Sequence, residues 1–499
     1  MPAPLSTPDR DHDLIAGSDP GRVLDALFVN APLRDYDQRA RVNDYTLPVL
    51  GMGYIATFAR QAGHNVGVLD AEAHGLGIQR TATLINQLRP RWVGFNLLAP
   101  TYDLTARIAA QLDPDILIMV GGHHAKATPS TVLRDQRFHN IGALIIGEGE
   151  TRAAAILSDV HRRQSLPQVM WRDAGQTHPK LGIFHGPTQP WLAPDINEMP
   201  FVDRRFLPQD PYRADDGLIE ANLVCSRGCP YECGFCGAAQ SMNKDVTIRT
   251  RDPRNIIAEM DQLHEQYGVS AFRAVDDLLL GVRRVIHHTL KAFTDDRTGE
   301  RYVWDATGRI NILDREDDEI LAALRTSGLR EVALGVESGA PRILTAMDKR
   351  ITPERTLSVT RRLLQHGISV KGYFILGYPG ENREEAEQTL HHIKDLWALS
   401  DRLPGTFRAS AFVFRPYPGS PIFNDLVRQG YDPVAMQTYS DIDLTDHGAD
   451  EAMRGRDEFN FTTGQQFGEV PLDELNQMLA DVSREQYERT HGTRQEADA

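Results

Sequence analysis

The residues best suited to chemistry are the cysteines, which all fall within one short stretch: Cys225, Cys229, Cys233 and Cys236. The last three have the spacing C-x3-C-x2-C. Gly228, directly before this motif, and Gly234 within it permit unusual backbone angles, and Pro230 fixes one dihedral, so this stretch can form a tight loop that points three thiolates at one centre. Three thiolates on a cubane iron–sulfur cluster leave one iron without a protein ligand, and that iron can bind a small chelating molecule.

Cysteines in a short stretch can also form disulfide bonds or a structural zinc site. Disulfides are not expected, because the chain shows no secretory context. A structural zinc site is an alternative, although such sites usually pair two C-x2-C knuckles separated by a dozen or more residues. Cys225 lies outside the three-cysteine spacing and is expected to be a small buried residue at the end of a strand.

Two segments of this stretch resemble a known family. Cys229-Pro-Tyr-Glu-Cys233-Gly-Phe-Cys236 resembles the cluster motif of radical S-adenosylmethionine (SAM) enzymes, and Ser226-Arg-Gly-Cys-Pro-Tyr231 resembles the subgroup with an N-terminal cobalamin-binding domain. The resemblance implies a 4Fe-4S cluster whose free iron chelates the amino and carboxylate groups of SAM. One electron then cleaves the sulfonium to a 5′-deoxyadenosyl radical.

The elements that must position the cysteine loop are alternating strands and helices. Strands are predicted at 218–224, 271–275, 303–307, 331–335, 370–376 and 408–414, and helices at 253–266, 282–293, 317–326, 353–365 and 383–399. Six β/α units over residues 216–425 predict a partial (β/α)6 TIM-type barrel, in which chemistry takes place at the carboxyl ends of the strands.

Polar or glycine-rich residues follow each predicted strand of this barrel. Asp276 could be a helix cap and Glu337-Ser338-Gly339 a turn, but the cysteine loop and the other strand ends share the same edge. By resemblance, Gly237 and Ala238 lie near the adenine and methionine, and Glu337 and Ser338 hold the ribose and carboxylate, with Lys349 a weaker candidate. The residues that the resemblance assigns to SAM are Tyr231, Phe235, Gly237, Ala238, Asp276, Arg309, Glu337 and Ser338, and those assigned to the cluster are Cys229, Cys233 and Cys236.

Residues 21–160 show the same alternation with shorter units. Strands are predicted at 25–30, 65–70, 92–96, 115–120 and 143–146, with helices at 49–62, 78–88 and 101–112. This pattern predicts a Rossmann-like, doubly wound parallel sheet whose ligand lies beyond the carboxyl ends of the strands. Neither G-x-G-x-x-G after the first strand nor G-x4-G-K-[ST] is present, so pattern alone leaves the ligand open.

The family resemblance identifies the loops of this domain with those that face a corrinoid. The residues that it assigns to cobalamin are Asn96, Leu97, Thr101, Gly121, Gly122, His123, Thr128, Gly147, Glu148 and Gly149. The D-x-H-x-x-G motif that supplies a cobalt ligand elsewhere is absent. His123 and His124 are expected to be polar loop residues, and cobalt would then lack a protein imidazole.

The remaining segments are less informative. Residues 1–20 are expected to be a disordered tail, 161–215 a linker with a few edge strands, and 426–499 a helical C-terminal segment with an amphipathic helix at 471–490. Tyr439 and Asp441 in that segment could cap the substrate. The start of the chain lacks the features of a signal peptide, and no apolar run is long enough for a membrane helix. These features predict a cytoplasmic protein that does not associate with a membrane.

Composition limits the classes of partner. With 54 basic and 69 acidic side chains the net charge is −15, and there is no Lys/Arg block, which argues against nucleic-acid binding. The expected partners are a small-molecule substrate and an external one-electron reductant of the flavodoxin or ferredoxin type. Candidate substrates include amino sugars, heteroaromatic rings, phosphorus-containing acids and lipids.

The resemblance as a whole is to cobalamin-dependent radical SAM methyltransferases. It implies that one SAM methylates cobalamin, that a second yields the 5′-deoxyadenosyl radical, and that the substrate radical takes its methyl group from methylcobalamin. Relatives that form or rearrange rings without methyl transfer remain an alternative, and a non-enzymatic metal-binding module is another. Methylthiotransferases carry three further cysteines in the N-terminal domain, which has none here.

Overall fold

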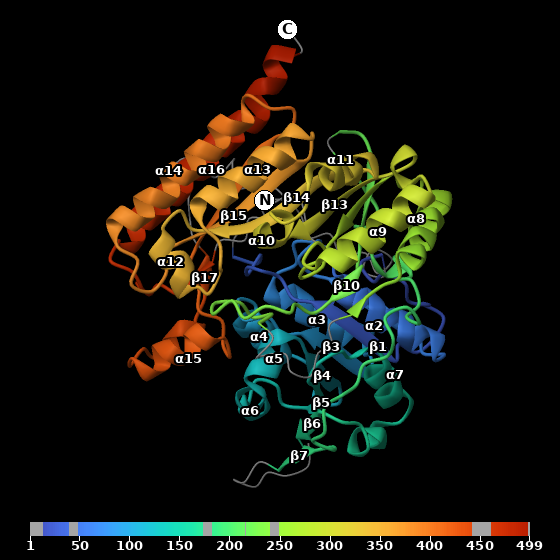
Figure 1. The fold of residues 1–499 in the computed structure, drawn as a ribbon. Helices are drawn as coiled ribbons and strands as arrows, with labels where there is room; N and C mark the ends of the chain where they lie inside the picture. Colours follow the sequence, from blue (N-terminus) through green and yellow to red (C-terminus); the bar gives the residue numbers. More distant parts are fainter. Residues whose placement is uncertain are drawn as a thin grey trace. The chain divides into compact units, whose positions relative to one another are not determined.

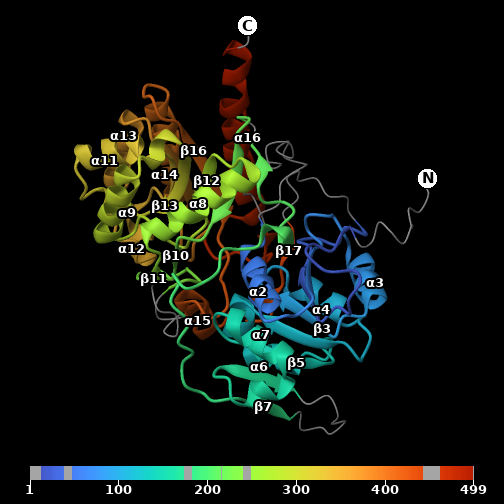
Figure 2. The same ribbon diagram turned by 90° about the vertical axis from the view of Figure 1, so that its right-hand side faces the viewer.

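The computed structural model describes residues 13–38, 48–172, 182–214, 216–239, 249–441 and 461–497 (Figures 1 and 2). The chain divides into two compact units. The first comprises Met1–Pro194 and Glu198–Asp210, and the second comprises Asp195–Asn197 and Pro211–Ala499. Among the described residues no helix is both long and apolar enough to cross a membrane.

The first unit is built on a seven-stranded sheet with the order β2-β1-β3-β4-β5-β6-β7. Its five parallel strands are β1 (Ala26–Asn30), β2 (Val66–Asp70), β3 (Trp92–Asn96), β4 (Leu117–Gly121) and β5 (Ile141–Ile145). Two antiparallel strands extend one edge, β6 (Val169–Arg172) and β7 (Ile183–His185). Both lie within the segment that was expected to be a linker with edge strands.

Helices cover both faces of this sheet, as the doubly wound prediction requires. They are α2 (Leu50–Gln61), α3 (Ile78–Leu88), α4 (Tyr102–Ala109), α5 (His123–Ala127), α6 (Pro129–Arg134) and α7 (Glu150–Ser158). Alternate residues of a strand point to opposite faces. Leu27 and Val29 of β1 therefore pack with α3 and α4, whereas Ala26 and Phe28 pack with α2 and α7. The predicted Rossmann-like fold is confirmed.

The second unit contains a seven-stranded sheet with the order β16-β15-β14-β13-β12-β9-β8. Six neighbouring strands are parallel: β9 (Ile219–Leu223), β12 (Ala271–Ala274), β13 (Val303–Gly308), β14 (Leu329–Glu337), β15 (Ser369–Leu376) and β16 (Phe407–Val413). The short β8 (Tyr212–Arg213) pairs antiparallel with β9. Six parallel strands in an unclosed sheet confirm the predicted partial barrel.

The helices of this unit follow the strands in alternation (Figure 1). They are α8 (Pro253–Tyr267), α9 (Arg283–Asp295), α10 (Ile310–Leu313), α11 (Asp318–Thr326), α12 (Pro341–Ala346), α13 (Pro353–Gln365), α14 (Arg383–Ser400), α15 (Pro421–Arg428) and α16 (Leu472–Ala497). Short antiparallel pairs join β10 (Ser226–Arg227) to β11 (Arg249–Thr250) and β17 (Ser440–Asp441) to β18 (Phe461–Thr462). All five predicted barrel helices and the C-terminal helix are present, as α8, α9, α11, α13, α14 and α16.

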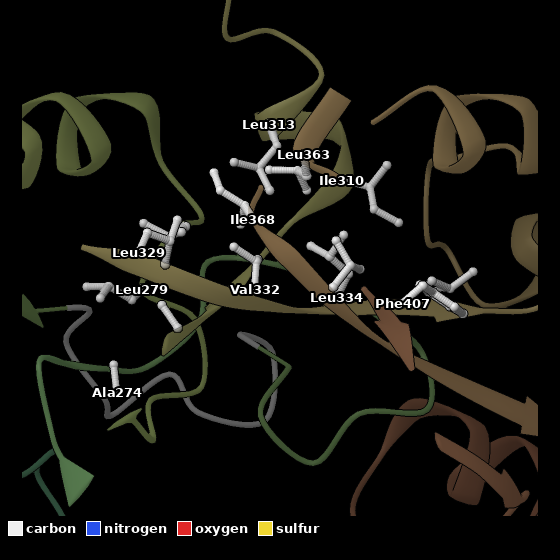
Figure 3. Close-up of a cluster of buried hydrophobic side chains, with 14 of the residues drawn as sticks. Ala274, Leu279, Ile310, Leu313, Leu329, Val332, Leu334, Leu363, Ile368 and Phe407 are labelled. Carbon is white, nitrogen blue, oxygen red and sulfur yellow. The ribbon is translucent and has the colours of Figure 1, made fainter. Parts of the chain in front are cut away.

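The two faces of the barrel sheet differ in chemistry. Apolar side chains on the outer face form the main core with the helices, and Figure 3 shows Val332 and Leu334 of β14 beside Leu363 of α13. Charged side chains occupy the inner face at the amino-terminal half of the strands. Arg408 donates to both carboxylate oxygens of Glu331, at 2.7 and 2.8 Å. The inner face is therefore a polar surface, whereas the outer face is a conventional core.

Candidate functional site

The cysteine loop follows β9 and is tied to the second unit at several points. The Gly234 N–H donates to the Met347 carbonyl at 3.1 Å, and the Gly234 carbonyl accepts from the Ile422 N–H at 3.0 Å. The Tyr231 hydroxyl donates to the Gly281 carbonyl at 2.9 Å. These bonds connect the loop to segments that follow three other strands, so its position is set by the barrel rather than by the loop alone.

The three predicted cluster thiols lie in a shielded environment. Cys233 is buried, and Cys229 and Cys236 are half-buried. Burial raises the pKa of Cys229 and raises that of Cys236 to about 11, and in each case the neighbouring thiols add to the rise. Bare thiolates are therefore costly here, and the site suits cysteines whose negative charge is shared with bound iron.

The donor set fits a cubane better than a single ion. Within the described ranges, no group of three or more His, Cys, Asp or Glu side chains converges closely enough to hold one metal ion. In a cubane each thiolate binds a different iron, so the ligands need not converge in that way.

Cys225 packs in the barrel core, and burial raises its pKa well above the usual value. It is a buried structural residue, as expected, which leaves a four-cysteine zinc site without its fourth ligand.

Arg309 connects the cysteine loop to the rest of the site. Its Nη1 donates to the Cys233 sulfur at 3.5 Å, and its guanidinium carbon lies 3.6 Å from the centroid of the Tyr231 ring. Its Nη2 donates to the Lys349 carbonyl at 3.1 Å. The structure thus brings together Tyr231, Cys233 and Arg309, which the sequence pattern placed on two separate elements.

A buried ion pair lies at the end of β14. The Lys349 ammonium donates to Glu337 Oε1 at 2.5 Å, and its nitrogen lies 5.9 Å from the centroid of the Phe235 ring. Glu337 has a φ of 66°, an unusual value for a residue with a side chain. A Cβ on Gly335 would lie 2.3 Å from Glu337 Oε1, so this glycine makes room for the pair.

Two of the predicted SAM residues point into the protein. The Ser338 hydroxyl is fully buried, lies 3.0 Å from the Thr389 hydroxyl and accepts from the Ala340 N–H. Asp276 accepts from the Cys225 N–H at 2.8 Å and from the Ser226 hydroxyl at 3.1 Å, and burial raises its pKa to about 7. Both side chains stabilise the loops around the site in this structure.

The last two predicted SAM residues follow the third cluster cysteine. The Ala238 N–H lies 3.4 Å from the Cys236 sulfur, and no atom of the described residues comes within 4 Å of a Cβ placed on Gly237. The backbone is half-buried here, and the described residues do not crowd it.

Sequence reasoning missed Glu381, which is fully buried beside the glycine loop after β15. Its Oε2 accepts from the Gly377 N–H at 2.5 Å, and burial raises its pKa to about 7. The glycine-rich segment Gly377–Gly380 follows the strand predicted at 370–376, and the acidic residue directly after it is the signal that the sequence offers.

In the first unit, the predicted cobalamin residues lie at the carboxyl ends of β3, β4 and β5. Gly122 has a φ of 93°, and a Cβ there would lie 2.1 Å from the Asn96 side-chain oxygen. Gly147 has a φ of 86°, and Glu148 and Gly149 are half-buried next to it. This edge therefore presents close-packed backbone with a glycine at each sharp turn, the surface that an extended cofactor tail requires.

Several residues of this edge face inward. Leu97 is fully buried, its N–H donates to the Gly121 carbonyl, and its carbonyl accepts from the His124 N–H. Thr101 is also buried. The Thr128 hydroxyl donates to the His124 carbonyl at 2.9 Å. The structure thus directs the Leu97 and Thr101 side chains into the domain, whereas the half-buried Thr128 hydroxyl bonds back to the preceding turn.

The two histidines differ from each other. His123 is exposed, but His124 is buried against the Tyr102 ring at 4.4 Å, and burial lowers its pKa to about 4. The expectation of a polar loop residue is therefore wrong for His124, because an aromatic neighbour on α4 covers it.

A further positioning residue is Arg152, whose fully buried guanidinium donates to the carbonyls of Ile146 and Glu148.

Comparison with known proteins gives two family matches and several relatives. Residues 223–393 match the radical SAM superfamily, and residues 40–157 match the B12 binding domain. An uncharacterized methyltransferase of Pyrococcus horikoshii is 29% identical, with 80% of this chain and 82% of the relative covered. Cytidylyl-2-hydroxyethylphosphonate methyltransferase of Streptomyces wedmorensis is 26% identical, with 77% and 78% covered. An anaerobic magnesium-protoporphyrin IX monomethyl ester cyclase of Rubrivivax gelatinosus is 24% identical, with 76% and 66% covered.

The fold is also similar to that of a solved structure. The radical SAM methyltransferase TsrM from Kitasatospora setae, solved with cobalamin and a 4Fe-4S cluster, superposes with a TM-score of 0.58 at 16% identity. The match covers 81% of this chain and 75% of that one. At this level of identity the likeness concerns the fold.

Proposed function

This chain belongs to the family of cobalamin-dependent radical SAM methyltransferases, and from this premise we propose that it methylates an unactivated carbon, or a phosphorus atom, of a small-molecule intermediate. Its cofactors are a 4Fe-4S cluster, SAM and cobalamin. Together they supply a radical that removes hydrogen from the substrate and a methyl group that replaces it. The observation that carries the proposal is a three-cysteine loop at the carboxyl edge of a partial barrel, in a chain that also contains a cobalamin-type unit.

In this proposal the two parts of the chain hold different cofactors. Residues 21–160 bind cobalamin through the carboxyl ends of β3, β4 and β5, and residues 216–425 bind the cluster and SAM. Glu337 and Lys349 are proposed to orient the SAM ribose and carboxylate, which is supported by their position next to Phe235 of the cysteine loop. Positioning is the main task of such residues, because radical attack on carbon requires no general base.

The inner face of β15 and β16 is proposed to bind the substrate. Strand register places Gly335, Tyr373 and Ser410 side by side, and Gly335 lies beneath the Glu337–Lys349 pair. The Tyr373 and Phe412 rings are 6.1 Å apart. This surface therefore adjoins the proposed SAM site and offers aromatic side chains to a substrate.

Charged groups next to this surface favour a substrate with an anionic group. The Lys371 ammonium lies 5.0 Å from the centroid of the Tyr373 ring, and the Arg415 guanidinium lies 5.7 Å from that of Phe412. The Ser410 hydroxyl is buried, and no protein group in the described part of the chain accepts or donates a hydrogen bond to it. A carboxylate or phosphorus oxyacid could accept a hydrogen bond from the Ser410 hydroxyl and would lie beside these two cations, and one relative is named for a phosphonate substrate.

Ring formation without methyl transfer is the second candidate, because relatives named as cyclases match three quarters of the chain. We further propose a cytoplasmic location and a flavodoxin- or ferredoxin-type donor, since the cluster needs reduced thiols and a one-electron source.

To test the proposal, the reconstituted enzyme is incubated with a panel of small molecules and with SAM that carries a deuterated methyl group. Methyl transfer predicts S-adenosylhomocysteine and 5′-deoxyadenosine in equal amounts, and a product that carries a CD3 group in place of the CH3 group of the ordinary methylated compound. A product formed with 5′-deoxyadenosine alone would reject methyl transfer in favour of ring formation.

Ser410→Ala should raise KM for an anionic substrate without lowering stability, since it removes a buried hydroxyl that has no described partner.

A further inference from the structure

Arg309 contacts one of the three cysteines that are predicted to bind the cluster. The Nη1–H group donates to the Cys233 sulfur at 3.5 Å, and the guanidinium stacks on the Tyr231 ring. The Arg309 side chain is only 7% exposed. A permanent positive charge is therefore held in a shielded position beside one of the three cluster thiolates.

The orientation of this guanidinium is fixed by bonds that do not involve the cysteines. Nη2 donates to the Lys349 carbonyl at 3.1 Å, and Nε donates to the Asn311 side-chain oxygen at 3.0 Å. Because the guanidinium is planar, two bonds and a stacking contact define the direction of the remaining N–H group. Arg309 is therefore positioned towards Cys233 before any cofactor binds.

We propose that Arg309 is a positioning residue that raises the reduction potential of the cluster. Reduction adds one electron from the external donor, and the extra negative charge is spread over iron and sulfur. A hydrogen bond to a ligand sulfur and a nearby cation both stabilise the reduced state more than the oxidised state. The shielded environment strengthens both effects. The proposal rests on the cluster of the proposed function, and on neither its substrate nor methyl transfer.

The test compares Arg309→Gln with a matched control, Arg315→Gln. Arg315 is exposed, and its charge also acts on Tyr231, where it opposes the rise in pKa that burial causes. Both variants lose one positive charge near the cysteine loop, but only Arg309→Gln loses the bond to sulfur. Full-length protein is reconstituted anaerobically with iron and sulfide, and the potential of the cluster is measured by redox titration followed by electron paramagnetic resonance.

The expected result is a full complement of iron and sulfide in both variants, with a more negative potential for Arg309→Gln and an unchanged potential for Arg315→Gln. A wild-type potential in Arg309→Gln with a full cluster would overturn the proposal, as would equal shifts in the two variants. If Arg309→Gln does not retain its cluster, the potential of the Asn311→Ala variant tests the proposal instead. This variant keeps the guanidinium but removes one bond that orients it, so a smaller negative shift supports the proposal and no shift overturns it.

This measurement needs neither cobalamin nor substrate. If methyl transfer fails in every assay, the effect of Arg309 on the potential is still decided. If the potential is unaffected, the proposed methyl transfer is likewise untouched, so the two proposals can fail separately.

Discussion

The Glu337–Lys349 pair illustrates how single residues of this site depend on their surroundings. Glu337 takes a left-handed backbone conformation, and Asp348 and Arg350 do the same on either side of Lys349, with φ values of 52° and 58°. These conformations are strained for residues with side chains and persist only where other contacts stabilise them. Both side chains are buried, so a change that separates them leaves two buried charges without partners.

Gly335→Ala should disrupt this pair while leaving the fold intact. The added Cβ would lie 2.3 Å from Glu337 Oε1 and 2.4 Å from the Lys349 nitrogen, so both side chains must move. We expect the Kd for SAM to rise on the order of tenfold, about 1.4 kcal/mol, in anaerobic titration calorimetry.

Gly51→Ala is the matched control, because no atom of the described residues lies within 4 Å of a Cβ added to this helical glycine of α2. It should bind SAM as wild type does. Unchanged SAM affinity in Gly335→Ala would remove Glu337 and Lys349 from the SAM site.

Glu381 should make stability depend on pH. Burial raises its pKa from 4.5 to about 7, so between these values the folded protein holds a proton that the unfolded chain releases. The free energy of unfolding therefore falls as pH rises through this window, by up to about 3 kcal/mol, and the loss persists above pH 7. Glu381→Gln is neutral throughout and should lose less stability between pH 5.5 and 7.5, as measured by Tm.

Glu384→Gln provides the comparison, because Glu384 is an exposed carboxylate on α14. Its Tm should follow the wild-type pH dependence. If Glu381→Gln also runs parallel to wild type, the carboxyl is not protonated in the folded state.

The sequence allowed the residues of the site to be predicted, but it did not allow the contacts between them to be predicted. The cysteine spacing and the polar residues after strands are visible in the sequence, and the family resemblance assigns Arg309 and Glu337 to the site. The contact between Arg309 and Cys233 was not predictable, because 76 positions separate the two residues and only the packing of the barrel brings them together. The burial of His124 likewise depends on Tyr102, a residue on another helix.

At the level of elements, α16 protects the open edge of the partial barrel. β16 is the last strand of its sheet, and an unpaired edge strand leaves backbone groups without partners. The Gln486 side-chain oxygen accepts from the Ala409 N–H of β16 at 2.7 Å and from the Trp397 indole N–H at 2.9 Å. One side chain of α16 therefore satisfies both the edge strand and the neighbouring helix.

Gln486→Leu should destabilise the protein by about 2 kcal/mol, because two donors lose their acceptor. Gln477→Leu alters an exposed position of the same helix and should change the free energy of unfolding by less than about 0.5 kcal/mol. Urea unfolding measures both. Equal effects would mean that α16 contributes general packing rather than protection of the edge.

Elements with strong periodicity were predictable almost to the residue. β3, α3 and α13 have the predicted ends at 92–96, 78–88 and 353–365. The helices α5 and α6 were not predicted, because five or six residues are too few to show a helical period. β14 runs to Glu337, two residues beyond its predicted end, because the pairing with β15 continues across an irregularity at Gly335.

At the level of the whole molecule, the chain combines two units of different architecture. Each has parallel strands and glycine-rich or polar loops at their carboxyl ends, the usual place for ligands in such folds. The two family matches fall on different units, residues 40–157 on the first and 223–393 on the second. The central claim is that one chain uses cobalamin and a SAM-cleaving cluster in the same reaction.

The measurement that tests this claim most directly is a cofactor and product analysis of the full-length protein. It is reconstituted anaerobically with iron, sulfide and hydroxocobalamin, desalted, and incubated with SAM and a reductant. We predict one corrinoid and one 4Fe-4S cluster per chain, with formation of both 5′-deoxyadenosine and S-adenosylhomocysteine. Replacement of Cys229, Cys233 and Cys236 by alanine should abolish iron binding and 5′-deoxyadenosine. A wild-type protein that retains no corrinoid and cleaves no SAM would contradict the account.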